Sequence, residues 1–151
     1  MQPLGGDRLR AGRLFFERVE DQIRTRRSFV IEVTLAGRTF RRIVHQLRQS
    51  GYQISMAFVF LPDPEACIAR IHERVQKGGH PIPAEDVIRR FSRSCNNFWN
   101  VYRPLADRWH LFYNGGFQVQ EVAVGMEDTM TVLDETLLDL FLEIARQSRN
   151  G

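Results

Sequence analysis

The feature that most constrains the fold is the unbroken apolar run at residues 56–61, which reads Met-Ala-Phe-Val-Phe-Leu. Apolar residues occupy both alternating sets of positions, so the run predicts a strand over residues 53–61 that is covered on both faces. Asp63 and Pro64 follow almost at once. Asp63 suits a helix N-cap and Pro64 suits the first helical position. We therefore expect a buried strand that leads directly into a helix.

The rest of the chain alternates between helical and extended patterns. Gly51 and the pair Gly78-Gly79 are placed to end helices. The turn Asn114-Gly115-Gly116 lies between two short strand patterns and predicts a hairpin. The expected helices cover residues 8–26, 38–49, 64–77, 84–101 and 129–147, and the other expected strands cover 28–34, 109–113 and 117–120. This alternation predicts a single α/β domain over residues 1–151, with three layers and right-handed crossovers.

The same patterns predict which side chains face the core. Apolar residues recur at helical spacing along each expected helix, most regularly at i, i+3, i+4 and i+7 from Phe40, which places them on one face. The predicted buried positions are Phe16, Val19, Ile23, Phe40, Ile43, Val44, Leu47, Ile68, Ile71, Val75, Val87, Ile88, Phe91, Cys95, Phe98, Leu133, Leu137, Leu140, Phe141 and Ile144.

Composition limits the function classes. No apolar run approaches the roughly 18 residues that span a bilayer, and the N-terminal residues form no signal-peptide core, so we expect a cytoplasmic protein with no membrane partner. Cys67 and Cys95 lie in helix-like segments and are expected to be reduced thiols. The net charge of +3 invites a nucleic-acid partner, but acids are interspersed with the arginines. We therefore expect a nucleotide and a small-molecule substrate as ligands, and we do not expect a nucleic acid.

The basic residues are arginines, with Lys77 as the one lysine. A Walker A loop needs the sequence G-x-x-x-x-G-K-[ST], with its lysine on the β- and γ-phosphates. Lys77 is followed by Gly78 and no such loop surrounds it. The 151 residues therefore contain no Walker A motif.

The densest group of candidate functional residues lies between residues 70 and 93. Two expected helices carry arginines at helical spacing, and the connector Gly78-Gly79-His80 lets these helices fold against each other. The arginines are Arg70 and Arg74 on the first helix and Arg89, Arg90 and Arg93 on the second. Facing each other, they would form a cage for phosphoryl oxygens, which guanidinium groups bind in a bidentate manner. The alternative is a solvated hairpin whose arginines pair with Glu73, Glu85 and Asp86.

Other polar residues are weaker candidates. Glu32 and Thr34 lie at the carboxyl end of an expected strand, where ligands bind in α/β sheets, so Glu32 could position a substrate hydroxyl or act as a base. It could equally be an edge-strand acid that pairs with an arginine. His80 could donate to a phosphate. His72 and His80 lack a third ligand at metal spacing, so no metal site is expected.

Several stretches of the sequence resemble those of a known protein family. The stretch LPDPEACIARIHERVQKGGHPIPAEDVIRRFSRS is similar to the lid of bacterial zeta-toxin-like P-loop kinases, with R-V-x-x-G-G-H-x-[IV]-P at its centre. Further matches are AGRLFFERV, FVIEVTLAGRTF and LADRWHLFYN, and the resemblance covers roughly residues 8–125. It implies a P-loop kinase-like sheet flanked by helices, with a lid at about residues 64–101.

The resemblance also implies an activity. The family transfers the γ-phosphoryl group of ATP or GTP with Mg²⁺, and zeta toxins proper act on a UDP-linked amino sugar. By resemblance, Arg74 with Arg90 or Arg93 would stabilise the transferred group. The residues implied to bind phosphate or nucleotide are Arg70, His80 and Arg89, and those implied to bind substrate are Glu32 and Thr34. An antitoxin or a second copy of the chain is the implied protein partner.

Three departures from the family accompany these matches. The family's first strand and P-loop are absent, so the chain is expected to be an N-terminally truncated kinase domain. The family's E-T-T-L-S-G is Glu32-Val33-Thr34-Leu35-Ala36-Gly37 here, and its D-N-S is Tyr113-Asn114-Gly115. We therefore expect a phosphotransferase that is inactive as this chain alone. The alternative is a degenerate, non-catalytic module that binds nucleotides or anions.

Overall fold

The computed structural model describes residues 5–148, except for the side chains of residues 5–9 and 11. It comprises two compact units, residues 1–33 and residues 34–151. The first unit holds helix α1 (Gly5–Thr25), which confirms the helix predicted over residues 8–26. No described helix combines the length and the apolar character that crossing a bilayer requires.

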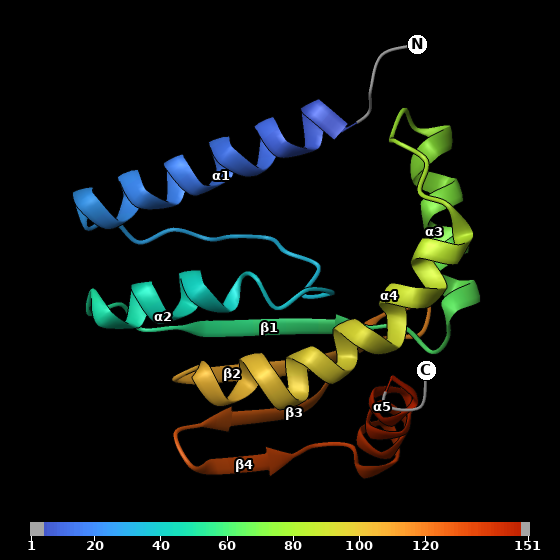
Figure 1. Cartoon of the computed structure of the whole chain (residues 1–151). Helices are drawn as coiled ribbons and strands as arrows, with labels where there is room; N and C mark the ends of the chain where they lie inside the picture. Colours follow the sequence, from blue (N-terminus) through green and yellow to red (C-terminus); the bar gives the residue numbers. More distant parts are fainter. Residues whose placement is uncertain (1–4, 149–151) are drawn as a thin grey trace. The chain divides into compact units, whose positions relative to one another are not determined.

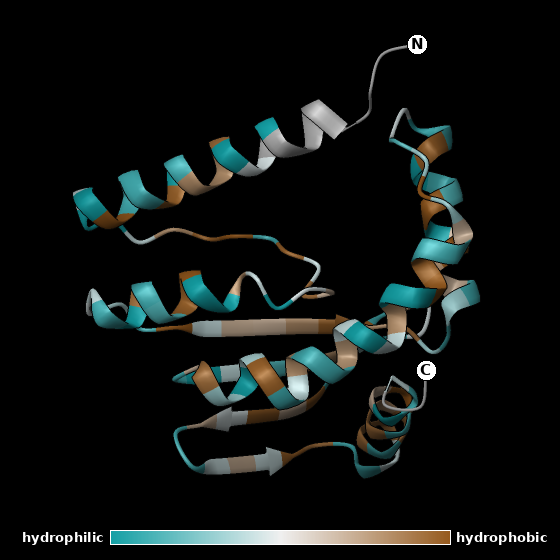
Figure 2. Cartoon of the chain, viewed as in Figure 1, coloured by the Kyte–Doolittle hydropathy of each residue, from teal (hydrophilic) through white to brown (hydrophobic). Residues whose placement is uncertain are grey.

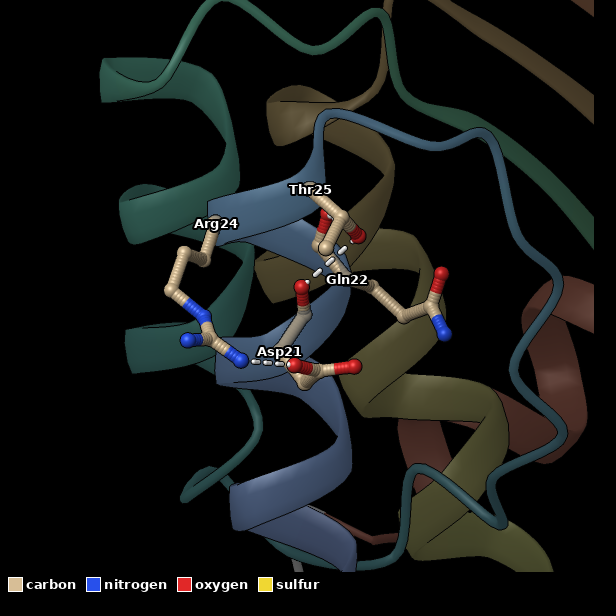
Figure 3. A network of polar contacts seen from close by, with 4 residues as sticks. All are labelled: Asp21, Gln22, Arg24 and Thr25. Carbon is tan, nitrogen blue, oxygen red and sulfur yellow. Dashed lines mark hydrogen bonds and ion pairs between the residues drawn. The ribbon is translucent and has the colours of Figure 1, made fainter.

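Local polar contacts end helix α1. The Thr25 hydroxyl donates to the backbone carbonyl oxygens of Asp21, at 2.8 Å, and Gln22, at 3.3 Å. The Arg24 guanidinium pairs with the Asp21 carboxylate in the same turn (Figure 3). Arg26 then takes the left-handed conformation, with φ 52°, that commonly follows a helix. At this helix end, arginine occupies the position where glycine is usual.

The prediction of a strand over residues 28–34 is wrong. This segment belongs to no strand, and Val30 is almost fully exposed. A β-branched sequence forms a strand only where a neighbouring strand supplies the other half of the ladder. None of the strands that the structure describes pairs with this segment. Glu32 therefore does not lie at the carboxyl end of a strand.

The second unit contains a four-stranded mixed sheet in the order β1-β2-β3-β4 (Figure 1). Strand β1 (Ser55–Phe60) pairs in parallel with β2 (Arg108–Asn114). The antiparallel partners that follow are β3 (Val119–Met126) and β4 (Thr129–Val132). The predicted hairpin after Asn114 is therefore confirmed. The chain is a mixed α/β protein, as expected, with an open sheet.

Two expectations about the strands are wrong. Strand β1 is an edge strand, and Ala57 and Val59 are exposed, so its apolar run is not covered on both faces. The final helix was expected to begin at residue 129, but Thr129–Val132 forms strand β4 instead. The Glu127-Asp128 turn lets this β-branched run fold back on β3, and helix α5 (Glu135–Gln147) begins only after the Asp134 N-cap.

The helices of this unit begin and end largely where the sequence predicts. They are α2 (Arg41–Gln49), α3 (Pro64–Gln76) and α4 (Ala84–Asn97), and α4 continues as a π-helical segment, η1 (Phe98–Tyr102), and a 3₁₀ turn, η2 (Arg103–Leu105). The Asp63 carboxylate caps α3 by accepting a hydrogen bond from the Ala66 N–H at 2.7 Å. Gly51 and Gly78 follow α2 and α3 with φ of 84° and 92°, which confirms both as helix stops.

The core lies between the sheet, α4 with η1, and α5. Phe141 of α5 contacts Phe58, Phe60 and Phe98 with ring centroids 5.0–6.2 Å apart. In Figure 2, hydrophobic colours mark β1 and parts of α5, whereas α2 is largely hydrophilic. The buried positions predicted correctly are Val19, Ile43, Val44, Leu47, Val87, Cys95, Phe98, Phe141 and Ile144. Those that are exposed instead are Phe16, Val75, Ile88 and Leu133.

Helix α3 shows why some of these positions stay exposed. It has no buried residue, and Ile68 and Ile71 are only half-buried. The helix packs mainly against α4. An apolar stripe predicts which face of a helix turns inward, but the depth of burial depends on what that face meets.

Asp107, the residue before strand β2, links that strand to the segment after α2 by a hydrogen bond. Its carboxylate accepts a hydrogen bond from the Ile54 N–H at 2.7 Å and lies 3.9 Å from the Arg48 guanidinium. Asp107→Ala would leave the N–H of the buried Ile54 unpaired, so we expect the free energy of unfolding to fall by about 1–3 kcal/mol. Urea denaturation followed by tryptophan fluorescence measures this. Asp139→Ala, at an exposed position of α5, is the control. Equal stability of the two variants would refute the role of Asp107.

Candidate functional site

A polar cleft of about 700 Å³ lies in the second unit. The loop before α2, the helix formed by α4 and η1, and the end of α5 build its walls. The lining residues are Ala36, Gly37, Arg38, Arg93, Asn96, Asn97, Asn100 and Ser148. This volume is in the range of small-molecule sites. Two of the eight lining residues are cations and none is an acid, so the cleft suits an anion.

One helical stripe supplies half of the lining. Arg93, Asn96, Asn97 and Asn100 are spaced i, i+3, i+4 and i+7, which places them along one side of α4 and its continuation. The opposite side of the same helix is apolar and enters the core through Cys95 and other residues. At Phe98 the helix widens into the π-helical turn, a distortion that is frequent at functional sites.

The helix holds the loop of the cleft through two hydrogen bonds. The Asn97 amide donates to the Leu35 carbonyl oxygen at 2.8 Å, and the Tyr102 hydroxyl donates to the Gly37 carbonyl oxygen at 2.7 Å. Asn97 and Tyr102 are both buried. Leu35 adopts φ 53°, a left-handed conformation that is unusual for a residue with a side chain. Such strained residues persist where their surroundings hold them, and they cluster at binding sites.

The hydrogen bonds from Asn97 and Tyr102 form a clamp on the loop, and this clamp leaves backbone N–H groups of the loop available at the cleft. Within the described part of the chain, the N–H groups of Ala36, Gly37 and Arg38 donate to no protein acceptor. All three residues line the cleft. Burial raises the pKa of Tyr102, so its hydroxyl stays protonated and keeps its hydrogen bond to the loop. The loop can therefore offer backbone donors beside the Arg38 guanidinium.

Helix α5 contributes its C-terminal end. The last carbonyl groups of a helix carry partial negative charge, which disfavours an anion. The Asn96 amide donates to one of them, the Ala145 carbonyl oxygen, at 3.0 Å. Ser148 adds a hydroxyl to the lining. Asn96 thus satisfies a carbonyl close to the cleft and joins α4 to α5.

Of the eight site residues predicted from the sequence, Arg93 is the one that lines the cleft. Arg70 and Arg74 are exposed on α3, Arg90 is half-buried on α4, and His80 is exposed in the connector. Arg89 is paired with Asp86 at 2.7 Å, as the alternative of a solvated hairpin would have it. Among the described side chains, the other four arginines form no ion pair.

The two candidate substrate residues lie on either side of the division between the units. Glu32 is exposed in the first unit, and Thr34 is exposed at the start of the second. Both cysteines are free thiols, and Cys67 is half-buried. Burial raises the pKa of the Cys95 thiol to about 12, so this side chain stays neutral and belongs to the core.

Sequence reasoning missed most of the cleft. Arg38 stands in TLAGRTF, which carries part of the resemblance, but no pattern in the sequence marks it as a site residue. Asn96, Asn97 and Asn100 were also missed. A signal was present, because polar residues at i, i+1 and i+4 inside a helix with a buried apolar face mark a polar stripe. The turn at Leu35 that completes the cleft had no signal of comparable strength.

Comparison of the chain with models of protein families, with curated proteins and with solved structures gives no match. The cleft is therefore interpreted from its own residues.

The resemblance implies ATP or GTP with Mg²⁺, and the cleft fits only part of that group. Arg38 and Arg93 suit the phosphates. The lining offers no carboxylate, the ligand through which proteins usually hold Mg²⁺. Among the residues that the structure describes, no group of three or more His, Cys, Asp or Glu is placed to hold a metal. The cleft residues therefore suit an anion and do not suit a magnesium ion.

Asn97 is expected to matter for both stability and ligand binding. Asn97→Leu removes the donor to the Leu35 carbonyl oxygen in a buried position, so we expect a loss of about 1–3 kcal/mol in the free energy of unfolding. Release of the loop should also weaken the binding of an anion in the cleft. Thermal unfolding and calorimetry measure the two effects. Asn100→Leu, at an exposed position of the same stripe, is the control for stability. Full stability of Asn97→Leu would show that the clamp is unimportant.

Proposed function

We propose that residues 34–151 form a binding module for a phosphate-bearing small molecule, of the class that includes nucleotides and nucleotide sugars. The observation that carries the proposal is the cleft lining, in which two guanidinium groups face no acid. Guanidinium groups bind phosphate oxygens in a bidentate manner, and the asparagine amides add neutral donors. This is the anion-binding alternative that the sequence left open, with Arg38 and Arg93 as its central residues.

Isothermal titration calorimetry with ATP, GTP and a UDP-sugar tests this function. We expect binding of at least one ligand, with an affinity that does not depend on Mg²⁺, because the lining lacks a carboxylate for the metal. The matched nucleosides without phosphate should bind far more weakly. Absence of heat for every phosphorylated ligand at millimolar concentration would reject the proposal.

Phosphoryl transfer is the second candidate, and one observation favours it. Arg93 is both a lid arginine by resemblance and a residue of the cleft. Catalysis of this kind consists mainly of positioning and of charge stabilisation by such groups. The 151 residues contain no Walker A loop to cradle the other phosphates. Release of labelled phosphate from γ-labelled ATP is the assay, and turnover abolished by Arg93→Gln would favour this candidate over binding alone.

A further inference from the structure

A second charged surface lies on helix α2. No Asp or Glu stands between Glu32 and Asp63, and α2 lies inside this acid-free segment. Its apolar residues Ile43, Val44 and Leu47 are all buried. The remaining side chains of the helix are exposed: Arg41, Arg42, His45, Gln46, Arg48 and Gln49. We call Arg41, Arg42, His45 and Arg48 the basic face of α2.

The basic face is organised in rows. Arg41, His45 and Arg48 are spaced i, i+4 and i+7, so they follow one another along one side of the helix. The Arg41 Nε–H donates to His45 Nε2 at 3.3 Å, which orders these two side chains along the row. Arg42, Gln46 and Gln49 form a second row with the same spacing. From Arg41 to Arg48 the charges extend over about 10 Å at the helical rise of about 1.5 Å per residue.

Little in the described structure neutralises this face. Arg48 lies 3.9 Å from the Asp107 carboxylate and donates to the Leu105 carbonyl oxygen at 2.6 Å. Arg41 and Arg42 form no ion pair with any side chain that the structure describes. The acids interspersed along the whole chain gave no reason to expect such a surface. The positive charge of the basic face comes from one segment of the chain that contains no Asp or Glu.

We propose that the basic face of α2 binds the phosphodiester backbone of a nucleic acid. Charges spread over about 10 Å match a repeating polyanion better than a single phosphate group. Arginine contacts phosphates in a bidentate manner, and glutamine is a common donor to phosphate and sugar oxygens. The face has no exposed aromatic residue on which bases could stack, so binding should be largely independent of sequence. The proposal concerns α2 and does not depend on the cleft.

Two other polyanions fit the face less well. Helices that lie on membranes insert apolar side chains, whereas the apolar residues of α2 are buried. An acidic polypeptide presents carboxylates at irregular spacing, while the backbone of a nucleic acid presents phosphates at a regular one. Both serve as opposing outcomes of the test.

Fluorescence anisotropy with the full chain and labelled 12-nucleotide DNA, single-stranded and duplex, tests the proposal. With about three phosphate contacts, affinity for the single strand should fall roughly 20-fold between 50 and 200 mM salt. Arg41→Gln/Arg42→Gln should weaken binding at least tenfold at 50 mM salt and reduce the salt slope by about 1.4. Arg108→Gln/Arg146→Gln removes the same charge elsewhere and should change affinity less than twofold.

Three outcomes would overturn the proposal. The first is the absence of binding to both the single-stranded and the duplex DNA at 20 mM salt. The second is an equal loss of DNA affinity in the two double variants. The third is binding to poly-glutamate, or to vesicles rich in phosphatidylserine, that is tighter than binding to DNA. Circular dichroism establishes that each variant is folded. Calorimetry with the phosphorylated small molecules should be unchanged in Arg41→Gln/Arg42→Gln. Failure of DNA binding with retained small-molecule binding would therefore reject this inference alone.

Discussion

Phe141→Ala is expected to lower the free energy of unfolding by about 3–5 kcal/mol. Phe141 is fully buried, and its ring lies 5.0 Å from Phe60 and 5.7 Å from Trp99. It joins α5 to the edge strand β1 and to the helix that forms the cleft. Truncation removes its apolar surface and leaves a cavity that the surrounding rings cannot fill. Since whole domains are stable by about 5–15 kcal/mol, this single change should bring the protein close to unfolding.

Chemical denaturation monitored by the fluorescence of Trp99 and Trp109 measures the effect. Phe117→Ala is the matched control, because it deletes the same ring at a fully exposed position of the β2–β3 turn. It should change stability by less than about 0.5 kcal/mol. A similar midpoint for both variants would mean that α5 does not pack on the sheet as described.

Features of the fold that depend on local chemistry could be predicted from the sequence. The Asp63 cap, the helix stops at Gly51 and Gly78 and the hairpin after Asn114 each follow from a few adjacent residues. Features that depend on distant partners could not. Residues 28–34 and β1 both have strand-like sequences, yet only β1 finds a partner, at β2. The sequence of such a segment does not show whether a neighbouring strand is available to pair with it.

The same distinction holds for the candidate site. Arg93 could be selected because arginines at helical spacing are visible in the sequence. The cleft also needs the loop at residues 35–38, which is brought to α4 by hydrogen bonds from Asn97 and Tyr102 across more than 60 positions of the chain. No local pattern predicts contacts of that separation. The proposed anion site thus arises from pairing one predictable helix with one unpredictable loop.

The second large effect is expected from Arg38→Gln/Arg93→Gln in the cleft. Each guanidinium would donate to phosphate oxygens, and a hydrogen bond to a charged group is worth about 1.5–3 kcal/mol. Loss of both should therefore weaken binding of a phosphorylated ligand by at least a hundredfold, since about 1.4 kcal/mol corresponds to a factor of ten. Calorimetry against the tightest ligand of the panel measures this. Because both side chains are exposed, the variant should remain as stable as the natural sequence.

Arg70→Gln/Arg74→Gln is the decisive comparison, because it removes the same charge from α3. If the cleft is the binding site, this variant should retain its affinity within about threefold, since neither residue lines the cleft. If instead the arginines of α3 and α4 close around the ligand as the lid resemblance implies, it should lose affinity as severely as the cleft variant. Arg93 belongs to both arrangements, so Arg93→Gln alone cannot separate them. Arg38→Gln alone, compared with the α3 pair, can separate them, and loss of affinity in the α3 pair with affinity retained in Arg38→Gln would refute the cleft as the site.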